Sequence, residues 1–218
     1  MRQFWRTGPR DVLDAGCGNG YFAWLAYLSG ARVVAMSFDK AQVEKAGKFL
    51  IGYRNADPAR LRFECRNLKD LAQETRSFDE IICYEVLEHI NDERSVVRQF
   101  FRILRPGGAL HLCCPYKLHP RHQREVLDLH ETGGHVRQGY TAEDYARLLE
   151  PEGFMLGDPV GIGTDSVCIA DALLRTVRNL AGDVAALPLL PLTLPFVWFA
   201  RLNPRVPFSL YVRAVKPA

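Results

Sequence analysis

The chain has 218 residues, of which 48% are hydrophobic and 24% are charged, so it can bury a core and is neither disordered nor fibrous. Its 28 Lys and Arg against 25 Asp and Glu give a formal net charge of +3, too small to indicate nucleic-acid binding. We expect one domain over residues 1–218 and no nucleic-acid partner.

Short apolar runs of β-forming residues alternate with helical patterns over the first two thirds of the chain. Strands are expected at 11–15, 32–36, 61–65, 78–84 and 109–114, and helices at 21–28, 40–53 and 92–104. This alternation predicts an α/β fold with a doubly wound parallel sheet that helices cover on both faces.

The pattern changes after residue 115. Residues 116–139 form a His-rich connection that is longer than a plain connector needs, which is typical of functional or mobile loops. Thr141 and Asp144 have the spacing of a capping box for a helix that ends near 151–153. A strand at 154–160, a helix at 166–180, an apolar, Pro-containing insertion at about 184–205 and a last strand at 209–215 complete the expected order.

Several features bear on the compartment. The opening MRQFWRTGPRD lacks the apolar core of a signal peptide. The uncharged segment 184–200 contains three prolines and as a helix would span only ~25 Å, less than the ~30 Å hydrocarbon core of a bilayer. The six cysteines form no C-x-x-C pair, which favours reduced core thiols. We therefore expect a cytoplasmic protein.

The sharpest motif is VLDAGCGNG at residues 12–20, between a predicted strand and a predicted helix. A doubly wound sheet binds its ligand at this place, at the carboxyl ends of the strands. The dinucleotide fingerprint needs a glycine where this chain has Tyr21, so a nicotinamide-dependent oxidoreductase is a weak rival.

With three further blocks, the chain resembles the class I S-adenosylmethionine-dependent methyltransferases, most closely the type-11 branch. The blocks are FDEIICYEVLEHI at 78–90, RILRPGGALHLCCP at 102–115 and GGHVRQGYTAEDYARLLEPEGF at 133–154. The resemblance implies a Rossmann-like sheet of seven strands with the last one antiparallel, and S-adenosyl-L-methionine as cofactor. It places ten residues at the cofactor: Asp14, Gly16, Cys17, Gly18, Gly20, Ser37, Phe38, Asn67, Leu68 and Glu85.

Two of these positions depart from the family pattern. Ser37 stands where the family has an acid that grips the ribose hydroxyls, and Asp39 would have to supply the carboxylate instead. Asn67 stands where the family has an Asp facing the adenine amino group, from which an amide oxygen can still accept a hydrogen bond.

The segment EVLEH after the fourth strand has two interpretations. In the first, Glu88 and His89 are ordinary packed or paired groups. In the second, a divalent ion is bound by Glu85, Glu88 and His89 together with the distant His135. The second arrangement resembles that of some ubiquinone-pathway and RNA-terminal 2′-O-methyltransferases. We expect no metal, because many type-11 sequences carry the same run without one.

The acceptor side is expected at GGHVRQGY. The resemblance places this loop over the methyl donor, with His135, Arg137 and Tyr140 facing the substrate and Gly133, Gly134 and Gly139 as hinges. A neutral imidazole is available near pH 7, so His135 and His89 are the candidate catalytic bases. The alternative is that the loop is only a solvated connection.

The sequence thus predicts methyl transfer from S-adenosylmethionine to an oxygen or nitrogen of a small or lipid-like acceptor. The apolar insertion, with Phe196, Trp198 and Phe199, would cover such an acceptor, or would rest on a membrane surface as a peripheral contact. The alternative function is a non-catalytic module that keeps the fold for protein or membrane contact.

Overall fold

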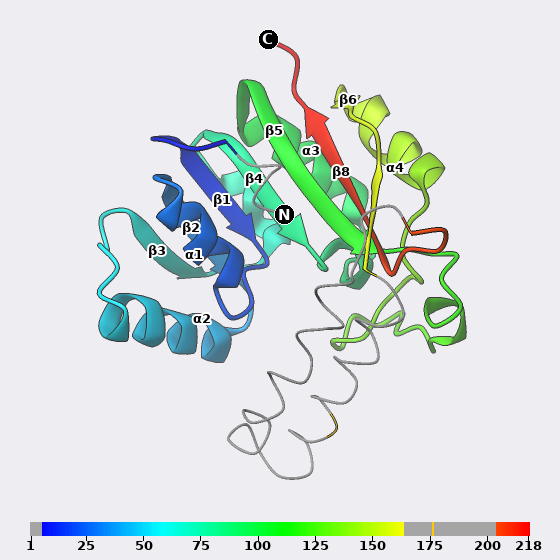
Figure 1. Ribbon diagram of the computed structural model, residues 1–218, viewed down its shortest axis with the longest axis horizontal. Helices are drawn as coiled ribbons and strands as arrows, with labels where there is room; N and C mark the ends of the chain where they lie inside the picture. Colours follow the sequence, from blue (N-terminus) through cyan, green and yellow to red (C-terminus); the bar gives the residue numbers. More distant parts are fainter. Residues whose placement is uncertain (1–5, 164–175, 177–203) are drawn as a thin grey trace.

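The computed structural model describes residues 6–163, 176 and 204–218, and a mixed sheet forms its centre (Figure 1). The strands follow the order β3-β2-β1-β4-β5-β8-β6, and β7 also pairs with β8. Their bounds are β1 Asp11–Ala15, β2 Arg32–Ser37, β3 Leu61–Cys65, β4 Phe78–Tyr84, β5 Leu104–Pro115, β6 Met155–Leu156, β7 Val160–Ile162 and β8 Ser209–Val215.

The first five strands are parallel and β8 runs antiparallel to β5. The expected doubly wound sheet with an antiparallel last strand is therefore confirmed. The expected strand at 154–160 is wrong in detail, because two short strands, β6 and β7, pair there with opposite ends of β8. The described sheet consequently has eight strands instead of seven.

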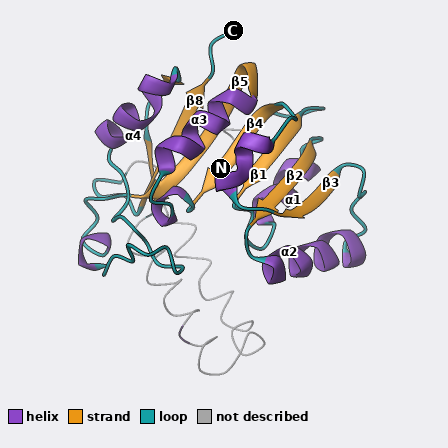
Figure 2. Cartoon of the chain, turned by 180° about the vertical axis from the view of Figure 1, so that it is seen from behind, coloured by secondary structure: helices purple, strands orange, loops and turns teal. Residues whose placement is uncertain are grey.

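Helices cover both faces of the sheet. In Figure 2, α3 (Glu93–Ile103) and α4 (Ala142–Leu149) lie on the face turned to the viewer, and α1 (Tyr21–Leu28) lies behind. A buried cluster joins Ala23 and Ala26 of α1 to Leu50, so α2 (Lys40–Gly47) and the turn after it pack on the α1 side. Short helical turns complete the fold: η2 Lys48–Tyr53, η3 Leu68–Gln73, η4 Leu87–His89, η5 His122–Arg124 and η6 Glu150–Glu152.

Two element ends differ from expectation, and one helix cap agrees with it. The helix expected at 40–53 changes at Lys48 into a π-helical turn. Strand β5 begins directly after α3, and a register shift between Phe78 and Glu80 takes up the Pro-Gly-Gly segment. The capping box of α4 is confirmed, since Thr141 Oγ1 accepts from Asp144 N at 3.2 Å and Asp144 accepts from Thr141 N at 3.0 Å.

Some predictions fall where the structure gives no description. The helix expected at 166–180 and the insertion at 184–205 lie outside the described residues, apart from residues 176, 204 and 205. Cys168 also lies outside them, whereas Cys17, Cys83, Cys113 and Cys114 are buried free thiols. Within the described part of the chain, every helix is too short or too polar to span a bilayer.

The strand order creates the place for a site. β1 lies between β2 and β4, so the chain leaves β1 toward one side of the sheet and later continues on the other. Ligands of doubly wound sheets bind in the crevice at such a switch point, beyond the carboxyl ends of the strands.

Candidate cofactor and acceptor site

A cavity of about 360 Å³ lies beyond the carboxyl ends of β1, β2, β3 and β4. It is lined by seven of the ten residues that the sequence places at the cofactor: Gly16, Gly18, Ser37, Phe38, Asn67, Leu68 and Glu85. Residues that the sequence did not single out also line it, among them Gln42, Lys69, Val86, Ile90 and Glu131. Val86 and Ile90 belong to the block at 78–90, whereas Gln42, Lys69 and Glu131 lie outside the quoted motifs.

The glycine turn after β1 forms one wall of the cavity. Gly16 has φ +88°, and a Cβ there would lie 2.3 Å from Val86 Cγ2, so only glycine fits. Gly18 has φ +51°, and its missing Cβ would meet nothing closer than Gln42 Oε1 at 3.9 Å. The space beside Gly18 is therefore open to a ligand, as a cofactor cradle requires.

Asp14, Cys17 and Gly20 do not line the cavity. Asp14 is 2% exposed, and burial raises the pKa of its carboxyl group to about 7 despite a hydrogen bond from Ala23 N. One Asp14 oxygen, Oδ2, has no partner among the described residues, so it remains available to a donor. Burial and the Asp14 charge raise the pKa of the Cys17 thiol to about 12, which leaves it unreactive. Gly20 is required by packing, because its Cβ would lie 2.9 Å from Leu50 Cδ1.

The two unusual positions, Ser37 and Asn67, both face the cavity. Ser37 Oγ accepts a hydrogen bond from Asp39 N at 3.2 Å. Asp39 caps α2 through Oδ1, which accepts from Ala41 N and Gln42 N, so its carboxylate is committed to the helix. Asn67 Oδ1 accepts from Lys69 N at 3.0 Å and has a second lone pair for another donor. Phe38, 75% exposed, offers an apolar face beside them.

An ion pair between Lys69 and Glu131 joins the His-rich loop to the turn after β3. Both residues line the cavity. Glu131 Oε1 also accepts from Asn91 N, and it holds a positive φ of 54°. The ion pair therefore connects two walls of the cavity that are 62 residues apart in sequence.

The two glutamates of EVLEH have different surroundings. Glu85 faces the cavity with φ +54°, and Ser209 Oγ donates to its Oε1 at 2.9 Å. Glu88 is fully buried, and His89 Nε2 lies 3.9 Å from its Oε1, beyond hydrogen-bond distance. Burial, aided by the charge of Glu85, raises the pKa of Glu88 well above its usual range. Burial thus disfavours a charged Glu88 carboxylate, and an approaching cation would offset this penalty.

The two candidate bases are brought together. The rings of His89 and His135 lie 4.7 Å apart, edge to face. His89 Nδ1 donates to Gly134 O at 2.9 Å, and His135 Nδ1 donates to Glu125 Oε2 at 2.8 Å. Each acceptor lacks a proton, so each Nε2 carries the lone pair. Burial lowers the pKa of His89, which keeps its imidazole neutral near pH 7.

Three of these side chains have the geometry of a cation site. Glu88, His89 and His135 each offer one ligand atom, and these atoms lie within 4.8 Å of one another. The fourth residue of the metal interpretation, Glu85, is not part of this group. The same lone pairs therefore serve either as bases or as ligands, and the two roles exclude each other.

Arg137 and Tyr140, which the sequence places toward the substrate, do not line the cavity beside Gly18. Arg137 Nη1 donates to the carbonyls of Leu87 and Ile90 at 2.7 and 2.8 Å, and Nη2 pairs with Glu93. Tyr140 is 3% exposed and stacks on Tyr145. Gly139 is no free hinge either, because a Cβ there would lie 2.0 Å from Pro115 O. These residues anchor the loop to the sheet.

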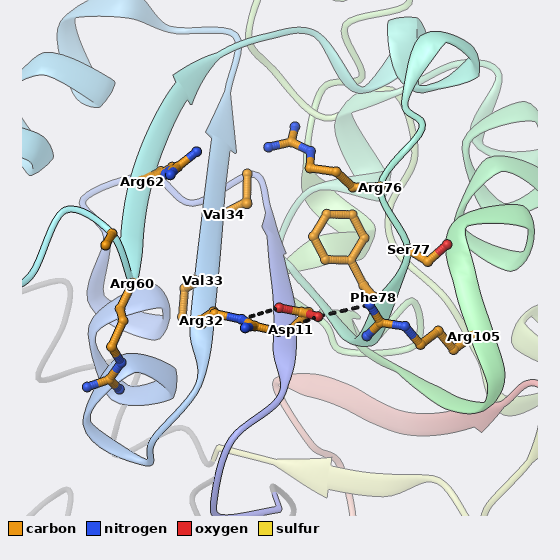
Figure 3. Close-up of a pocket in the computed structure, with 11 residues that line it drawn as sticks. Asp11, Arg32, Val33, Val34, Arg60, Arg62, Arg76, Ser77, Phe78 and Arg105 are labelled. Atoms are coloured by element: carbon orange, nitrogen blue, oxygen red, sulfur yellow. Dashed lines mark hydrogen bonds and ion pairs between the residues drawn. The ribbon is translucent and has the colours of Figure 1, made fainter.

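A second hollow opens at the other edge of the sheet, where β1, β2 and β3 begin (Figure 3). Five arginines surround it, namely Arg32, Arg60, Arg62, Arg76 and Arg105. Asp11 accepts from Arg32 at 2.7 Å and from Arg105 at 2.9 Å, as the dashed lines of Figure 3 mark. Acidic side chains thus already pair with part of this arginine cluster. The glycine turn after β1 lies at the opposite ends of the strands.

Comparison with known proteins decides the family. A family model described as a methyltransferase domain matches residues 2–156. This chain belongs to the S-adenosylmethionine-dependent methyltransferases.

Individual relatives agree with this assignment. A Mycolicibacterium smegmatis protein named as an S-adenosylmethionine-dependent methyltransferase is 30% identical over 167 residues, which are 72% of this chain and 56% of that protein. A ubiquinone biosynthesis O-methyltransferase of Xanthomonas oryzae is 36% identical over 102 residues, 46% of this chain and 41% of that enzyme. This methyltransferase chain thus spans about half the length of the curated relatives it matches.

A solved structure shares the fold. The phosphoethanolamine N-methyltransferase 2 of Haemonchus contortus, in complex with phosphomonomethylethanolamine and S-adenosylhomocysteine, superposes with a TM-score of 0.68. The match covers 100% of this methyltransferase and 51% of that chain at 18% identity, so it supports the fold alone.

Proposed function

We propose that this methyltransferase binds S-adenosylmethionine in the cavity beside Gly16 and Gly18 and transfers its methyl group to an oxygen or nitrogen of a small or lipid-like acceptor. The observation that carries the proposal is the cavity itself, at the switch point of the sheet and lined by seven of the ten residues that the sequence assigns to the cofactor. The residues fit the group, because an open cradle at Gly18 and the unpartnered Asp14 Oδ2 are features a bound cofactor would complete.

The cofactor would supply an electrophilic methyl group on a sulfonium. Gly16 and Gly18 allow the backbone to approach it closely, and Phe38, Ser37 and Asn67 provide apolar and hydrogen-bonding contacts on the side of β2 and β3. In-line displacement needs mainly a close and aligned acceptor, so no nucleophilic triad is required.

His135, with His89 beside it, is the base we propose for a hydroxyl acceptor. A hydroxyl must lose its proton as it is methylated, and the Nε2 lone pairs of these imidazoles are available for it. The curated relatives include ubiquinone biosynthesis O-methyltransferases and a 27-O-demethylrifamycin SV methyltransferase, which is consistent with an oxygen acceptor.

A lipid-like acceptor is supported by the surface of the loop that carries the base. Apolar side chains stand exposed on it: Leu118 at 51%, Val126 at 94% and Leu129 at 65%. Burying them against an apolar acceptor would stabilise the complex by about 25 cal/mol per Å².

Trideuteromethyl S-adenosylmethionine and a panel of phenols, aliphatic alcohols and amines test the proposal. We expect mass spectrometry to find a labelled product and an equal amount of S-adenosylhomocysteine. EDTA should leave turnover unchanged if His135 acts as a base, whereas loss of turnover that Mg²⁺ or Mn²⁺ restores would make His89 and His135 ligands. S-adenosylhomocysteine binding without transfer to any of these classes would favour the non-catalytic alternative.

A further inference from the structure

We propose that Glu125 is a positioning residue of this site: it holds His135 with Nε2 free for the acceptor proton, and buried His122 anchors Glu125 from the other side. The inference deepens the function proposed above and rests on it. Neither Glu125 nor His122 belongs to a sequence motif of the chain, and only the folded loop brings them to His135.

The first contact fixes the base. Glu125 Oε2 lies 2.8 Å from His135 Nδ1. A carboxylate can only accept, so the proton of a neutral His135 is on Nδ1 and the lone pair is on Nε2. Without this acceptor the two tautomers of an imidazole would compete, and only one of them exposes Nε2 as a base.

The second contact fixes the carboxylate. His122 is 2% exposed, with Nδ1 3.2 Å from Glu125 Oε1 and Nε2 3.1 Å from Phe208 O. The buried ring therefore bridges the Glu125 carboxylate and the Phe208 carbonyl, and it fixes the carboxylate from the side opposite His135.

The surroundings of the two imidazoles support this arrangement. The groups that face His135 are Glu125, the His89 ring at 4.7 Å and buried Glu88, whose ligand atom lies within 4.8 Å. The groups that face His122 are Glu125, the His119 ring at 5.3 Å and the Phe208 ring at 4.5 Å. In both environments Glu125 is the only anionic group in hydrogen-bond contact among the described residues.

The loop backbone holds this cluster in place. Asp128 N donates to His135 O at 2.8 Å and Val136 N donates to Glu88 O at 2.8 Å. The Asp128 carboxylate accepts from Thr132 and from Gly134 N, and these hydrogen bonds lower its pKa to about 2. The segment from Glu125 to His135 is thus a closed, hydrogen-bonded turn in which the carboxylate and the base are held opposite each other.

The proton balance of the step is simple. As the acceptor oxygen bonds to the methyl carbon, the carbon–sulfur bond breaks and its electron pair stays on sulfur. The acceptor proton moves to His135 Nε2, and the resulting imidazolium later releases it to water. Glu125 remains a carboxylate throughout and stabilises the positive charge on His135.

Imidazole NMR tests the inference without an acceptor. In protein with ¹⁵N-labelled histidine, two-bond ¹⁵N–¹H correlations show which ring nitrogen carries a proton, and single His→Gln variants assign the six histidines. We expect His135 as the Nδ1–H tautomer. In Glu125→Leu, His135 should become a mixture of tautomers. Glu150→Gln, at an exposed glutamate, is the matched control and should leave the His135 signals unchanged.

Kinetics provide the second readout. Turnover of Glu125→Leu should fall, but by less than the about 10²–10⁴-fold expected for loss of the base itself, because part of His135 keeps the productive tautomer. S-adenosylhomocysteine affinity should stay unchanged. Glu125→Gln should retain more turnover, and the acid limb of its pH profile should move to lower pH because the carboxylate no longer stabilises the imidazolium. A purely structural role of Glu125 would lower turnover without moving this limb.

The inference is overturned if His135 of the unaltered protein is the Nε2–H tautomer, or if Glu125→Leu keeps normal turnover and normal His135 signals. Its failure is distinguishable from failure of the proposed function. If only this inference fails, the protein still binds S-adenosylhomocysteine and transfers methyl. If the proposed function fails, the protein does neither, whatever the histidine spectra show.

Discussion

At the residue scale, His135 is the side chain on which the acceptor chemistry depends. We expect His135→Ala to lower turnover by about 10²–10⁴-fold and to leave S-adenosylhomocysteine affinity nearly intact, because the imidazole does not line the cofactor cavity. The defect should diminish at high pH, where a hydroxyl acceptor ionises without help. His130→Ala is the control, since His130 is on the same loop and donates to Asp128 through its backbone N–H, which the substitution keeps.

Ser37 is the second residue with a specific expectation. It faces the cavity at the end of β2, where the family resemblance places a carboxylate against the ribose, and Asp39 is committed to capping α2. We expect Ser37→Asp to tighten S-adenosylhomocysteine binding by about 1–2 kcal/mol, the contribution of a charge-assisted hydrogen bond. Ser37→Ala is the comparison, and tighter binding for Ala than for Asp in a calorimetric titration would show that the ribose is elsewhere.

The sequence predicts the residues of local motifs better than residues that meet through the loop. Gly16 and Gly18 were predictable because a strand, a glycine turn and a helix follow one another directly. Glu125 and His122 were not, because their role depends on a loop of more than twenty residues that folds back over β8 and η4. The contacts of Arg137 were not predictable either, since nothing in GGHVRQGY indicates that its guanidinium would meet three main-chain carbonyls.

At the scale of elements, a buried ion pair joins β4 to the residue before β1. Arg10 Nε lies 2.6 Å from Glu80 Oε2, and both side chains are at most 6% exposed. Replacing Glu80 by Leu leaves the Arg10 guanidinium buried without a carboxylate, which should lower the free energy of unfolding by about 3–5 kcal/mol in a denaturant titration. Glu44→Leu, which removes an exposed pair to Lys40 at 3.9 Å, should cost less than about 1 kcal/mol.

The same carboxylate predicts a pH dependence of stability. Burial opposes ionisation of Glu80, but His111 and Arg10 hold its pKa at about 2, below the ordinary 4.5. A lowered pKa contributes stability above the unfolded value, and this contribution is lost as the pH falls from about 4.5 toward 2. The unaltered protein should therefore lose stability over this range, and Glu80→Leu should lose less.

Element types followed from the sequence more reliably than element ends. The strands at the centre are largely buried and rich in apolar residues, and such segments have few alternatives. The strand expected at 154–160 is instead two short strands, β6 and β7, that pair with different parts of β8. Which parts of β8 are free to pair depends on the tertiary structure and not on the local sequence. The π-helical turn after Gly47 has no sequence signal of its own.

At the scale of the whole molecule, the sheet separates two charged environments. The cavity, the imidazoles of the loop and the buried acids lie at the carboxyl ends of the strands. The arginine cluster and its acidic partners lie at the amino ends. We expect the cofactor to bind at the carboxyl ends only, so Arg62→Ala at the amino ends should leave S-adenosylhomocysteine affinity unchanged. The insertion at 184–205 stays a prediction as a cover for the acceptor or as a peripheral membrane contact.

The most direct test of the account is calorimetric titration of S-adenosylhomocysteine into the protein, with NADH as the rival ligand. We predict saturable binding of S-adenosylhomocysteine, none of NADH, and loss of the binding in Gly18→Val, whose side chain would fill the open space at the glycine turn. Gly107→Val is the matched control, because Gly107 also has a positive φ, of 74°, and open surroundings but lies away from the cavity. Equal affinity of the unaltered protein and Gly18→Val, or binding of NADH instead, would contradict the assignment of this cavity to S-adenosylmethionine.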